Sequence, residues 1–156
     1  MPVRDDLSAL EGYHSPQVVV DVRLNTNEAP VGPPQAFCDD FAAAVAGIEW
    51  HRYPDRSASE LRAAIAGLHG VDPSMVFVAN GSNEVIQTLL LTFAGPGRRV
   101  ATFEPTYQLH AHIARITGAT VVEGERSADF SLDLSEVRRV ISEHRPHVTF
   151  LCSPNN

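Results

Sequence analysis

The pattern of apolar and polar residues predicts short strands that alternate with amphipathic helices. Predicted strands cover residues 75–79, 100–103, 120–122 and 148–152, each a short run of mostly apolar residues. Between and before them, apolar residues recur every three or four positions, which predicts helices over residues 37–48, 57–68, 82–93, 106–116 and 134–141. This succession indicates an α/β fold with a mostly parallel sheet covered by helices.

Residue types at the ends of the predicted helices indicate where these helices start and stop. Ser57 and Glu60 form a capping-box pattern, and Gly70 is placed to end the helix that follows. Thr106 is expected to cap the helix that Gly118 ends.

The chain divides by composition into an N-terminal arm, residues 1–33, and part of a larger α/β domain, residues 34–156. The arm contains a β-rich run at 18–22, then polar residues and several prolines. Such a segment has no core of its own, so we expect it to lie on another part of the protein.

Charge and composition exclude several classes of partner. Twelve arginines, no lysine and 19 acidic residues give a formal net charge of −7, which is not the footprint of a nucleic-acid-binding protein. No apolar stretch approaches the roughly 20 residues that span a bilayer, and the N-terminus lacks the apolar segment of a secretion signal. We therefore expect a cytoplasmic protein that binds neither nucleic acid nor membrane.

The cysteines and histidines predict neither a disulfide nor a metal site. Cys38 and Cys152 lie far apart in a chain without secretory features, so they are expected to be reduced core residues. Neither has metal-ligand spacing, and His110 and His112 project from different faces of one predicted helix.

The turn at residues 80–83, Asn-Gly-Ser-Asn, is a candidate phosphate-binding site. A helix that begins directly after a strand leaves several N–H groups unpaired at the positive end of its dipole, and glycine lets a ligand approach closely. These are the properties of an anion site. An ordinary turn capped by Ser82 or Asn83 remains the alternative.

Two further loops follow predicted strands and carry side chains of interest. Tyr107 follows the strand at 100–103, and Asn155 and Asn156 follow the strand at 148–152. Functional groups gather at the carboxyl ends of parallel strands, so the three loops are expected to form one cleft. Taken singly, Tyr107 could be a half-buried aromatic residue and the asparagines turn formers.

Five motifs in this order resemble the N-terminal part of the fold-type I pyridoxal-phosphate-dependent aminotransferases, and among them the histidinol-phosphate aminotransferases. The resemblance covers essentially the whole chain. The motifs are Arg-Leu-Asn-Thr-Asn-Glu at 23–28, Arg-Tyr-Pro-Asp at 52–55, Ala-Asn-Gly-Ser-Asn-Glu at 79–84, Phe-Glu-Pro-Thr-Tyr at 103–107 and Cys-Ser-Pro-Asn-Asn at 152–156.

The resemblance implies that the cofactor is pyridoxal 5′-phosphate. Gly81, Ser82 and Asn83 would bind its phosphate. Tyr107 would stack on the pyridine ring, and Asn156 would donate a hydrogen bond to the phenolic oxygen.

The resemblance also implies a homodimer with shared active sites. Tyr53 would reach the cofactor phosphate of the neighbouring subunit. Tyr13, Asn27 and Glu28 of the arm would lie near the substrate. The chain departs from the family at Ala29, where an asparagine is usual, and so lacks one side chain that could form local hydrogen bonds.

The implied reaction moves nitrogen from an amino donor, such as histidinol phosphate, to a 2-oxoacid such as 2-oxoglutarate. It requires a Schiff-base lysine, and the chain contains no lysine, so none of its residues is assigned that catalytic role. We therefore expect an N-terminal part of such an enzyme that ends before the catalytic lysine and is inactive alone.

Three other functions stay open at this point. An aromatic amino acid aminotransferase or an amino acid phosphate decarboxylase of the same fold would share these motifs. A non-catalytic module that binds a phosphate ligand is a different class, although the three-glycine dinucleotide motif and the phosphate-loop lysine are both missing.

Overall fold

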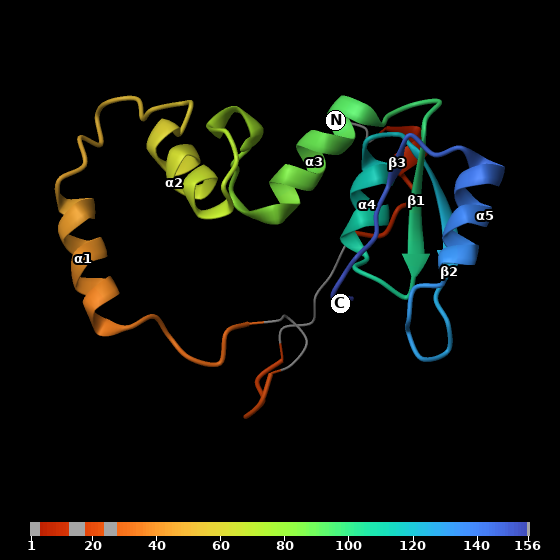
Figure 1. Cartoon of the computed structure of the whole chain (residues 1–156), viewed down its shortest axis with the longest axis horizontal. Helices are drawn as coiled ribbons and strands as arrows, with labels where there is room; N and C mark the ends of the chain where they lie inside the picture. Colours follow the sequence, from red (N-terminus) through yellow and green to blue (C-terminus); the bar gives the residue numbers. More distant parts are fainter. Residues whose placement is uncertain (1–3, 13–17, 24–27, 156) are drawn as a thin grey trace. The chain divides into compact units, whose positions relative to one another are not determined.

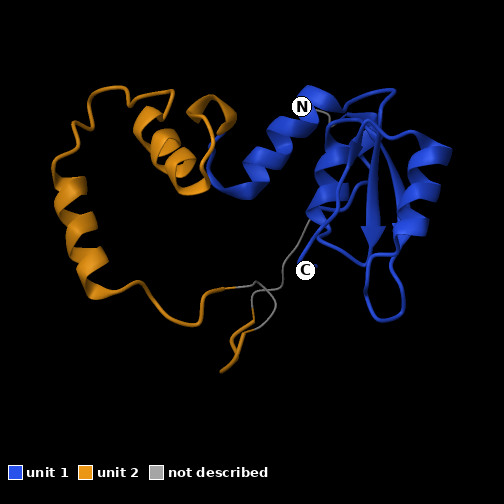
Figure 2. Ribbon diagram, in the orientation of Figure 1, with its two compact units in different colours: residues 1–13, 77–156 blue, residues 14–76 orange. Residues whose placement is uncertain are grey.

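The computed structural model describes residues 4–12, 18–23 and 28–155. The chain forms two compact units (Figure 2). One comprises residues 1–13 and 77–156, and the other comprises residues 14–76.

A parallel three-stranded sheet organises the first unit, as predicted (Figure 1). Its order is β2–β1–β3, with β1 at Arg99–Glu104, β2 at Thr120–Glu125 and β3 at Val148–Thr149. The third strand is shorter than expected, but the Phe150 N–H continues the pairing by donating to Ala101 O at 2.9 Å.

Helices cover both faces of this sheet, which explains why its central strand is buried. The helices are α3 (Gly81–Phe93), α4 (Leu109–Ile116) and α5 (Leu134–His144). Successive residues of a strand point to opposite faces. Val100 accordingly packs in a cluster with residues of α3 and α4, whereas Ala101 and Phe103 pack with residues of α5.

The predicted strand at 75–79 is wrong. Met75 ends a short 3₁₀ helix, η2 (Pro73–Met75), and residues 76–79 are not paired with any strand in the described part of the chain. Val76 has extended geometry, with φ −106° and ψ 125°, but its carbonyl accepts from Arg62 Nε at 2.9 Å. A strand requires a neighbouring ladder for its N–H and C=O groups, and apolar sequence alone does not supply one.

The second unit contains two helices close to their predicted positions, α1 (Gln35–Ala46) and α2 (Ser59–His69). Gly70, with φ +65°, ends α2 as expected. The predicted capping box is wrong, because the residue before the helix is Ala58 and it makes no side-chain cap. The Asp55 carboxylate instead accepts from the N–H groups of Ser57 and Ser59 at 2.9 and 2.7 Å, which lowers its pKa.

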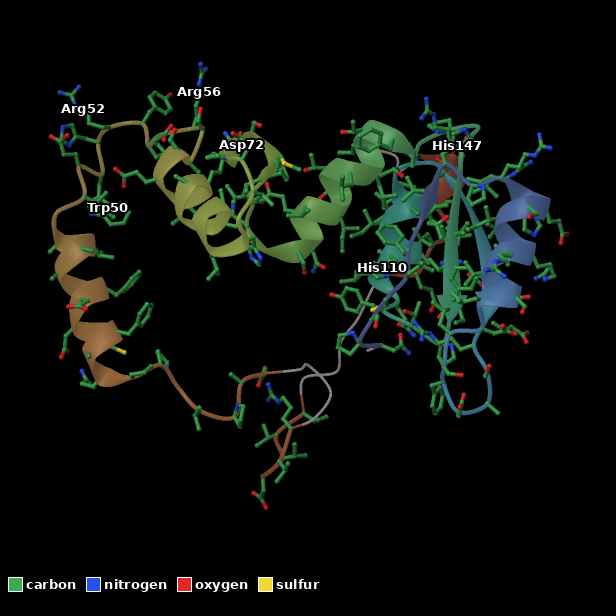
Figure 3. All side chains as sticks on the ribbon, viewed as in Figure 1. Trp50, Arg52, Arg56, Asp72, His110 and His147 are labelled. Carbon is green, nitrogen blue, oxygen red and sulfur yellow. The ribbon has the colours of Figure 1, made fainter. Side chains whose placement is uncertain are left out.

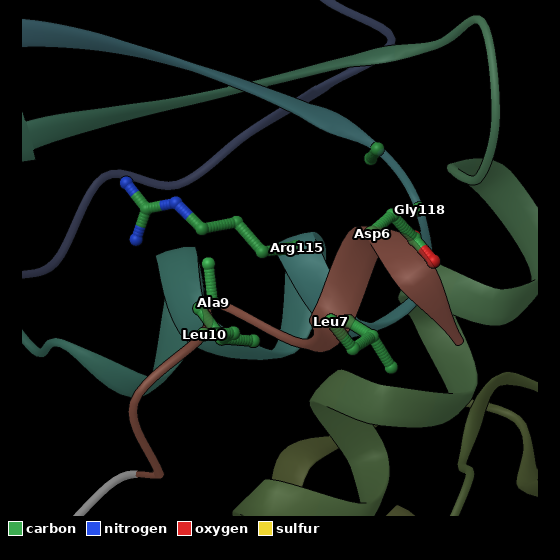
Figure 4. Close-up of a pocket in the computed structure, with 7 residues that line it drawn as sticks. Asp6, Leu7, Ala9, Leu10, Arg115 and Gly118 are labelled. Atoms are coloured by element: carbon green, nitrogen blue, oxygen red, sulfur yellow. The ribbon is translucent and has the colours of Figure 1, made fainter. Parts of the chain in front are cut away.

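The described part of the predicted arm is not uniform. Asp5–Leu7 forms a 3₁₀ helix, η1, in the first unit, and Arg4 Nη2 donates to Ile116 O at 3.2 Å. A hollow of about 380 Å³ lies beside it, lined by Asp6, Leu7, Ala9, Leu10, Arg115, Gly118 and Ala119 (Figure 4). Residues 18–22 form no strand, and Val19 is 102% exposed.

Gly124 of β2 provides a stability test of the packing between the sheet and α5. A Cβ at this position would lie 2.7 Å from the Phe103 ring and 3.0 Å from Val140 Cγ2. We expect Gly124→Ala to lower the free energy of unfolding by about 1–3 kcal/mol, the usual range for an overpacked core. Urea unfolding of the complete gene product measures this loss.

Gly67→Ala is the matched control for that experiment. Gly67 lies inside α2, and a Cβ there would have no atom within 4 Å. Alanine favours a helix interior over glycine by up to about 1 kcal/mol, so this variant should be at least as stable as the parent. Equal stability of the Gly124→Ala variant and the parent would contradict the packing argument.

Candidate functional site

The loop that precedes α3 turns sharply at Gly81. The Gly81 N–H donates to Ala79 O at 2.9 Å, closing a tight turn around Asn80, which has φ −77° and ψ 79°. Gly81 itself has φ +80°, and a Cβ at this position would have no atom within 4 Å. The glycine therefore serves the backbone geometry and leaves open space beside the start of the helix.

The start of α3 keeps backbone donors available for an anion. Neither Ser82 nor Asn83 caps the helix, and Asn80 makes no side-chain cap. Glu84 Oε2 accepts from the Asn80 N–H at 2.6 Å. Within the described ranges, the N–H groups of Ser82 and Asn83 have no acceptor, and the helix dipole adds positive potential there.

Tyr107, after β1, lies next to this helix start. Its hydroxyl donates to Asn83 Oδ1 at 3.1 Å, which brings together two residues of the predicted site. The ring is half-buried and packs on the cluster between the sheet and α4. An aromatic face is thus held close to the free donors of α3.

The loop after β3 is joined to the loop after β1. Thr106 Oγ1 donates to Asn155 Oδ1 at 3.0 Å, and Asn155 Nδ2 donates to Pro105 O at 2.9 Å. The predicted cap of α4 by Thr106 is wrong, because α4 follows Gln108 without a side-chain cap and the Thr106 hydroxyl is used by Asn155. The Thr106 N–H is likewise held by Glu104 Oε2 at 3.0 Å.

The three loops that follow residues 75–79, β1 and β3 therefore meet through side-chain hydrogen bonds. The Tyr107–Asn83 bond joins the first two, and the Thr106–Asn155 bond joins the last two. Asn156 lies outside the described residues. A role in cofactor binding for Gly81, Ser82, Asn83, Tyr107 and Asn156 stays a prediction.

The other predicted site residues are placed less closely or lie outside the described residues. Tyr53 is 102% exposed, in a hollow of about 640 Å³ formed by the segment 47–54 of the second unit, beside Trp50 and Arg52, which Figure 3 labels. Glu28 forms an exposed ion pair with Arg23 at 3.4 Å. Tyr13 and Asn27 fall outside the described ranges.

The sequence did not single out His110 as part of the site (labelled in Figure 3). Its ring stacks on Phe150, with centroids 4.3 Å apart, and meets the Tyr107 ring edge-on at 5.3 Å. The residue is 8% exposed, and among the described residues the buried Nδ1 has no hydrogen-bond partner. The i, i+3 spacing of Tyr107 and His110 in the predicted helix at 106–116 was an available signal, since such residues share a helix face, although α4 itself begins at Leu109.

Burial lowers the pKa of His110 below its ordinary value of 6.5, and the charge of Glu104 acts in the opposite direction. As the pH falls below 6.5, the unfolded chain takes up a proton that the folded chain does not. Stability therefore does not depend on this group well above pH 6.5, where His110 is neutral in both states, and it falls as the pH drops below 6.5. We expect His110→Phe to reduce the slope of stability against pH over this range.

Urea midpoints at a series of pH values measure that slope. Phenylalanine keeps an aromatic ring between Tyr107 and Phe150 and removes the titrating group, so the variant and the parent differ mainly in protonation. Parallel pH profiles for the two proteins would show that His110 titrates alike in the folded and unfolded states.

Neither cysteine is one of the buried core residues that the sequence led us to expect. Cys38 and Cys152 are free thiols, both half-buried. In the described ranges, no cluster of three or more His, Cys, Asp or Glu residues is placed to hold a metal ion. No helix in these ranges has the length and apolarity needed to cross a membrane.

Comparison with known sequences identifies related proteins. The family described as aminotransferase class I and II matches residues 20–156. Histidinol-phosphate aminotransferase of Frankia casuarinae is 48% identical over 164 residues, covering 100% of this chain and 41% of that protein. The protein of the same name in Thermobifida fusca is 45% identical over 160 residues, covering 100% and 44%. The chain thus spans less than half the length of these relatives.

A solved structure confirms the predicted fold class. The structure is histidinol-phosphate aminotransferase from Sinorhizobium meliloti in complex with pyridoxal-5′-phosphate. It matches with a TM-score of 0.76 and 19% identity, over 84% of this chain and 35% of that chain. At this identity the likeness concerns the fold, an α/β arrangement around a parallel sheet.

Proposed function

The chain belongs to the class I and II aminotransferases, and from this premise we propose that it forms the N-terminal part of the cofactor site of a histidinol-phosphate aminotransferase. The observation that carries the proposal is the convergence of three loops. Hydrogen bonds from Tyr107 to Asn83 and from Thr106 to Asn155 join them in one place.

The start of α3 fits the phosphate of pyridoxal 5′-phosphate. The N–H groups of Ser82 and Asn83 are free to donate to phosphate oxygens, and Gly81 leaves space for them to approach. The positive end of the helix dipole favours the phosphate charge. The chemistry of this donor set therefore matches the anionic end of the cofactor.

Tyr107 and Asn156 would hold the other end. The Tyr107 ring, fixed by Asn83 and His110, offers a flat face on which the pyridine ring would stack. Asn156 would donate a hydrogen bond to the phenolic oxygen. When bound, the cofactor supplies an electron sink that stabilises negative charge on the substrate carbon.

Contacts with a second subunit and with substrate are part of the same proposal. Tyr53 would bind the cofactor phosphate of the partner in a homodimer, for which its full exposure here leaves it available. Tyr13 would approach the substrate in the site of the partner subunit, and Asn27 and Glu28 would line the entrance. The substrates would be histidinol phosphate and a 2-oxoacid such as 2-oxoglutarate.

Substrate assays of the complete gene product test this function. We expect glutamate formation from 2-oxoglutarate with histidinol phosphate as amino donor. Faster nitrogen transfer from aromatic amino acids would identify an aromatic aminotransferase, and carbon dioxide release would identify a decarboxylase. Saturable binding of a nucleotide, without binding of pyridoxal phosphate, would identify the non-catalytic module and overturn the proposal.

Borohydride reduction tests how the 156 residues hold the cofactor. They contain no lysine, so we expect noncovalent binding and no reducible attachment to a side-chain amine. Mass spectrometry after reduction, with the chain digested into peptides, locates any adduct. A side-chain adduct within residues 1–156 would contradict this expectation.

A further inference from the structure

Arg126 directly follows β2 and makes an unusual set of contacts. Its guanidinium donates to three main-chain carbonyl oxygens: Phe103 O from Nε at 3.3 Å, Phe130 O from Nη1 at 3.1 Å and Cys152 O from Nη2 at 2.8 Å. The Arg126 N–H also donates to Glu104 O at 2.8 Å. One half-buried side chain therefore connects three separate segments.

Among the described residues, the guanidinium of Arg126 donates to carbonyl groups and forms no ion pair with an acid. In the part of the chain that the structure describes, the arginines found in ion pairs are Arg4, Arg23, Arg115 and Arg139. Arginine has five N–H donors in a planar fork, which suits it to several fixed acceptors at once. This geometry identifies a fixed cross-link between backbone segments.

Two of the segments that Arg126 connects carry predicted cofactor contacts. Phe103 precedes the loop with Tyr107, and Cys152 precedes the turn with Asn155 and Asn156. These are the loops that the Thr106–Asn155 bond also joins.

The segment after β3 depends on such contacts for its position. The ladder of β3 with β1 covers two residue pairs, Val100 with Val148 and Ala101 with Thr149. Beyond it, the Phe150 N–H donates to Ala101 O within β1, Arg126 donates to Cys152 O, and Asn155 donates to Pro105 O just after β1. Arg126 therefore holds the chain just beyond the point where strand pairing ends.

We propose that Arg126 is a positioning residue of the cofactor site, holding the turn at 152–155 against the carboxyl end of β1. It does not itself touch the cofactor. This inference rests on the proposed function, because the turn matters for binding only if Asn156 contacts pyridoxal phosphate.

The test compares Arg126→Gln, Arg126→Lys and Arg99→Gln in the complete gene product. Arg99 is the matched control, because it lies at the amino end of β1 and donates from Nη1 to His144 O at 3.0 Å. Two measurements are made on each protein: hydrogen exchange of peptides covering residues 150–155, and the dissociation constant of pyridoxal phosphate with the apo protein.

We expect Arg126→Gln to speed exchange in residues 150–155 by about 10-fold and to weaken cofactor binding by a similar factor, as loss of charge-assisted hydrogen bonds predicts. Lysine places a single point charge where a fork is needed, so Arg126→Lys should restore neither property fully. Arg99→Gln should match the parent in both. Hydrogen exchange in α5 reports whether each variant remains folded. If Arg126→Gln unfolds, the exchange at 150–155 and the cofactor affinity of Arg126→Lys are compared with those of the parent instead.

The two measurements separate this inference from the proposed function. Unchanged exchange at 150–155 in the Arg126 variants would overturn the inference. Faster exchange with unchanged cofactor affinity would also overturn it, because the turn would then be held without serving the site. If the parent protein fails to bind pyridoxal phosphate, the proposed function fails and the positioning role falls with it.

Discussion

Gly81→Asp is expected to weaken pyridoxal phosphate binding by about 100-fold or more. Two unit charges about 4 Å apart interact by about 4 kcal/mol at an effective dielectric of 20, and solvent exposure of this turn reduces that figure. A Cβ at Gly81 would meet no other atom within 4 Å, but the φ of +80° strains any side chain placed there. The loss beyond that caused by an uncharged side chain would therefore come from charge repulsion at the phosphate.

Gly81→Asn is the matched control for this prediction. Asparagine has nearly the shape of aspartate, and both tolerate a positive φ, such as the +80° found here, better than most residues do. We expect it to weaken binding by less than about 5-fold, since it adds no charge. Fluorescence titration of each apo protein gives the dissociation constant of pyridoxal phosphate for both variants. Similar losses in the two variants would place the phosphate away from this turn.

Tyr107→Ala is expected to weaken cofactor binding by about 10- to 100-fold, from the 1–3 kcal/mol that stacking on an aromatic side chain typically contributes. The substitution removes the predicted stacking face, together with the edge-on contact to His110. It also removes the hydrogen bond to Asn83, which fixes the ring beside the start of α3. The same apo titration measures the loss.

Tyr107→Phe separates the ring from its hydroxyl. Phenylalanine keeps the stacking face and the packing on the cluster between sheet and α4, and loses only the hydrogen bond to Asn83. That bond is exposed, so we expect a loss of a few fold at most. If the Tyr107→Ala variant binds the cofactor as tightly as the Tyr107→Phe variant does, the Tyr107 ring does not stack on the cofactor.

The spacing of apolar residues predicted the sheet and its covering helices well, because this spacing follows directly from which side chains are buried. β1 and α5 lie at or within a few residues of the predicted segments, since their apolar positions face a core formed by the chain itself. The strand at 75–79 failed for the converse reason. Its apolar residues indicate burial, but Phe77 is 59% exposed and no ladder in the described residues pairs with it.

Helix caps were predicted less well, because several polar side chains compete for each helix end. Ser57 and Thr106 both had the right residue type at a suitable place. The N–H groups of Ser57 and Ser59 donate to the Asp55 carboxylate at the start of α2. The Thr106 hydroxyl donates to Asn155, which lies 49 positions further along the chain. The second of these contacts is invisible to local sequence patterns.

The sequence by itself determined the α/β class, the parallel order of elements and the residue types suited to an anionic, aromatic ligand, because these follow from spacing and side-chain chemistry. Only the tertiary structure decided which distant groups meet. It placed Tyr107 on Asn83, set His110 against Phe150 and gave Arg126 its three carbonyl partners. Such contacts depend on how strands align and where loops turn, and these are properties of the whole chain.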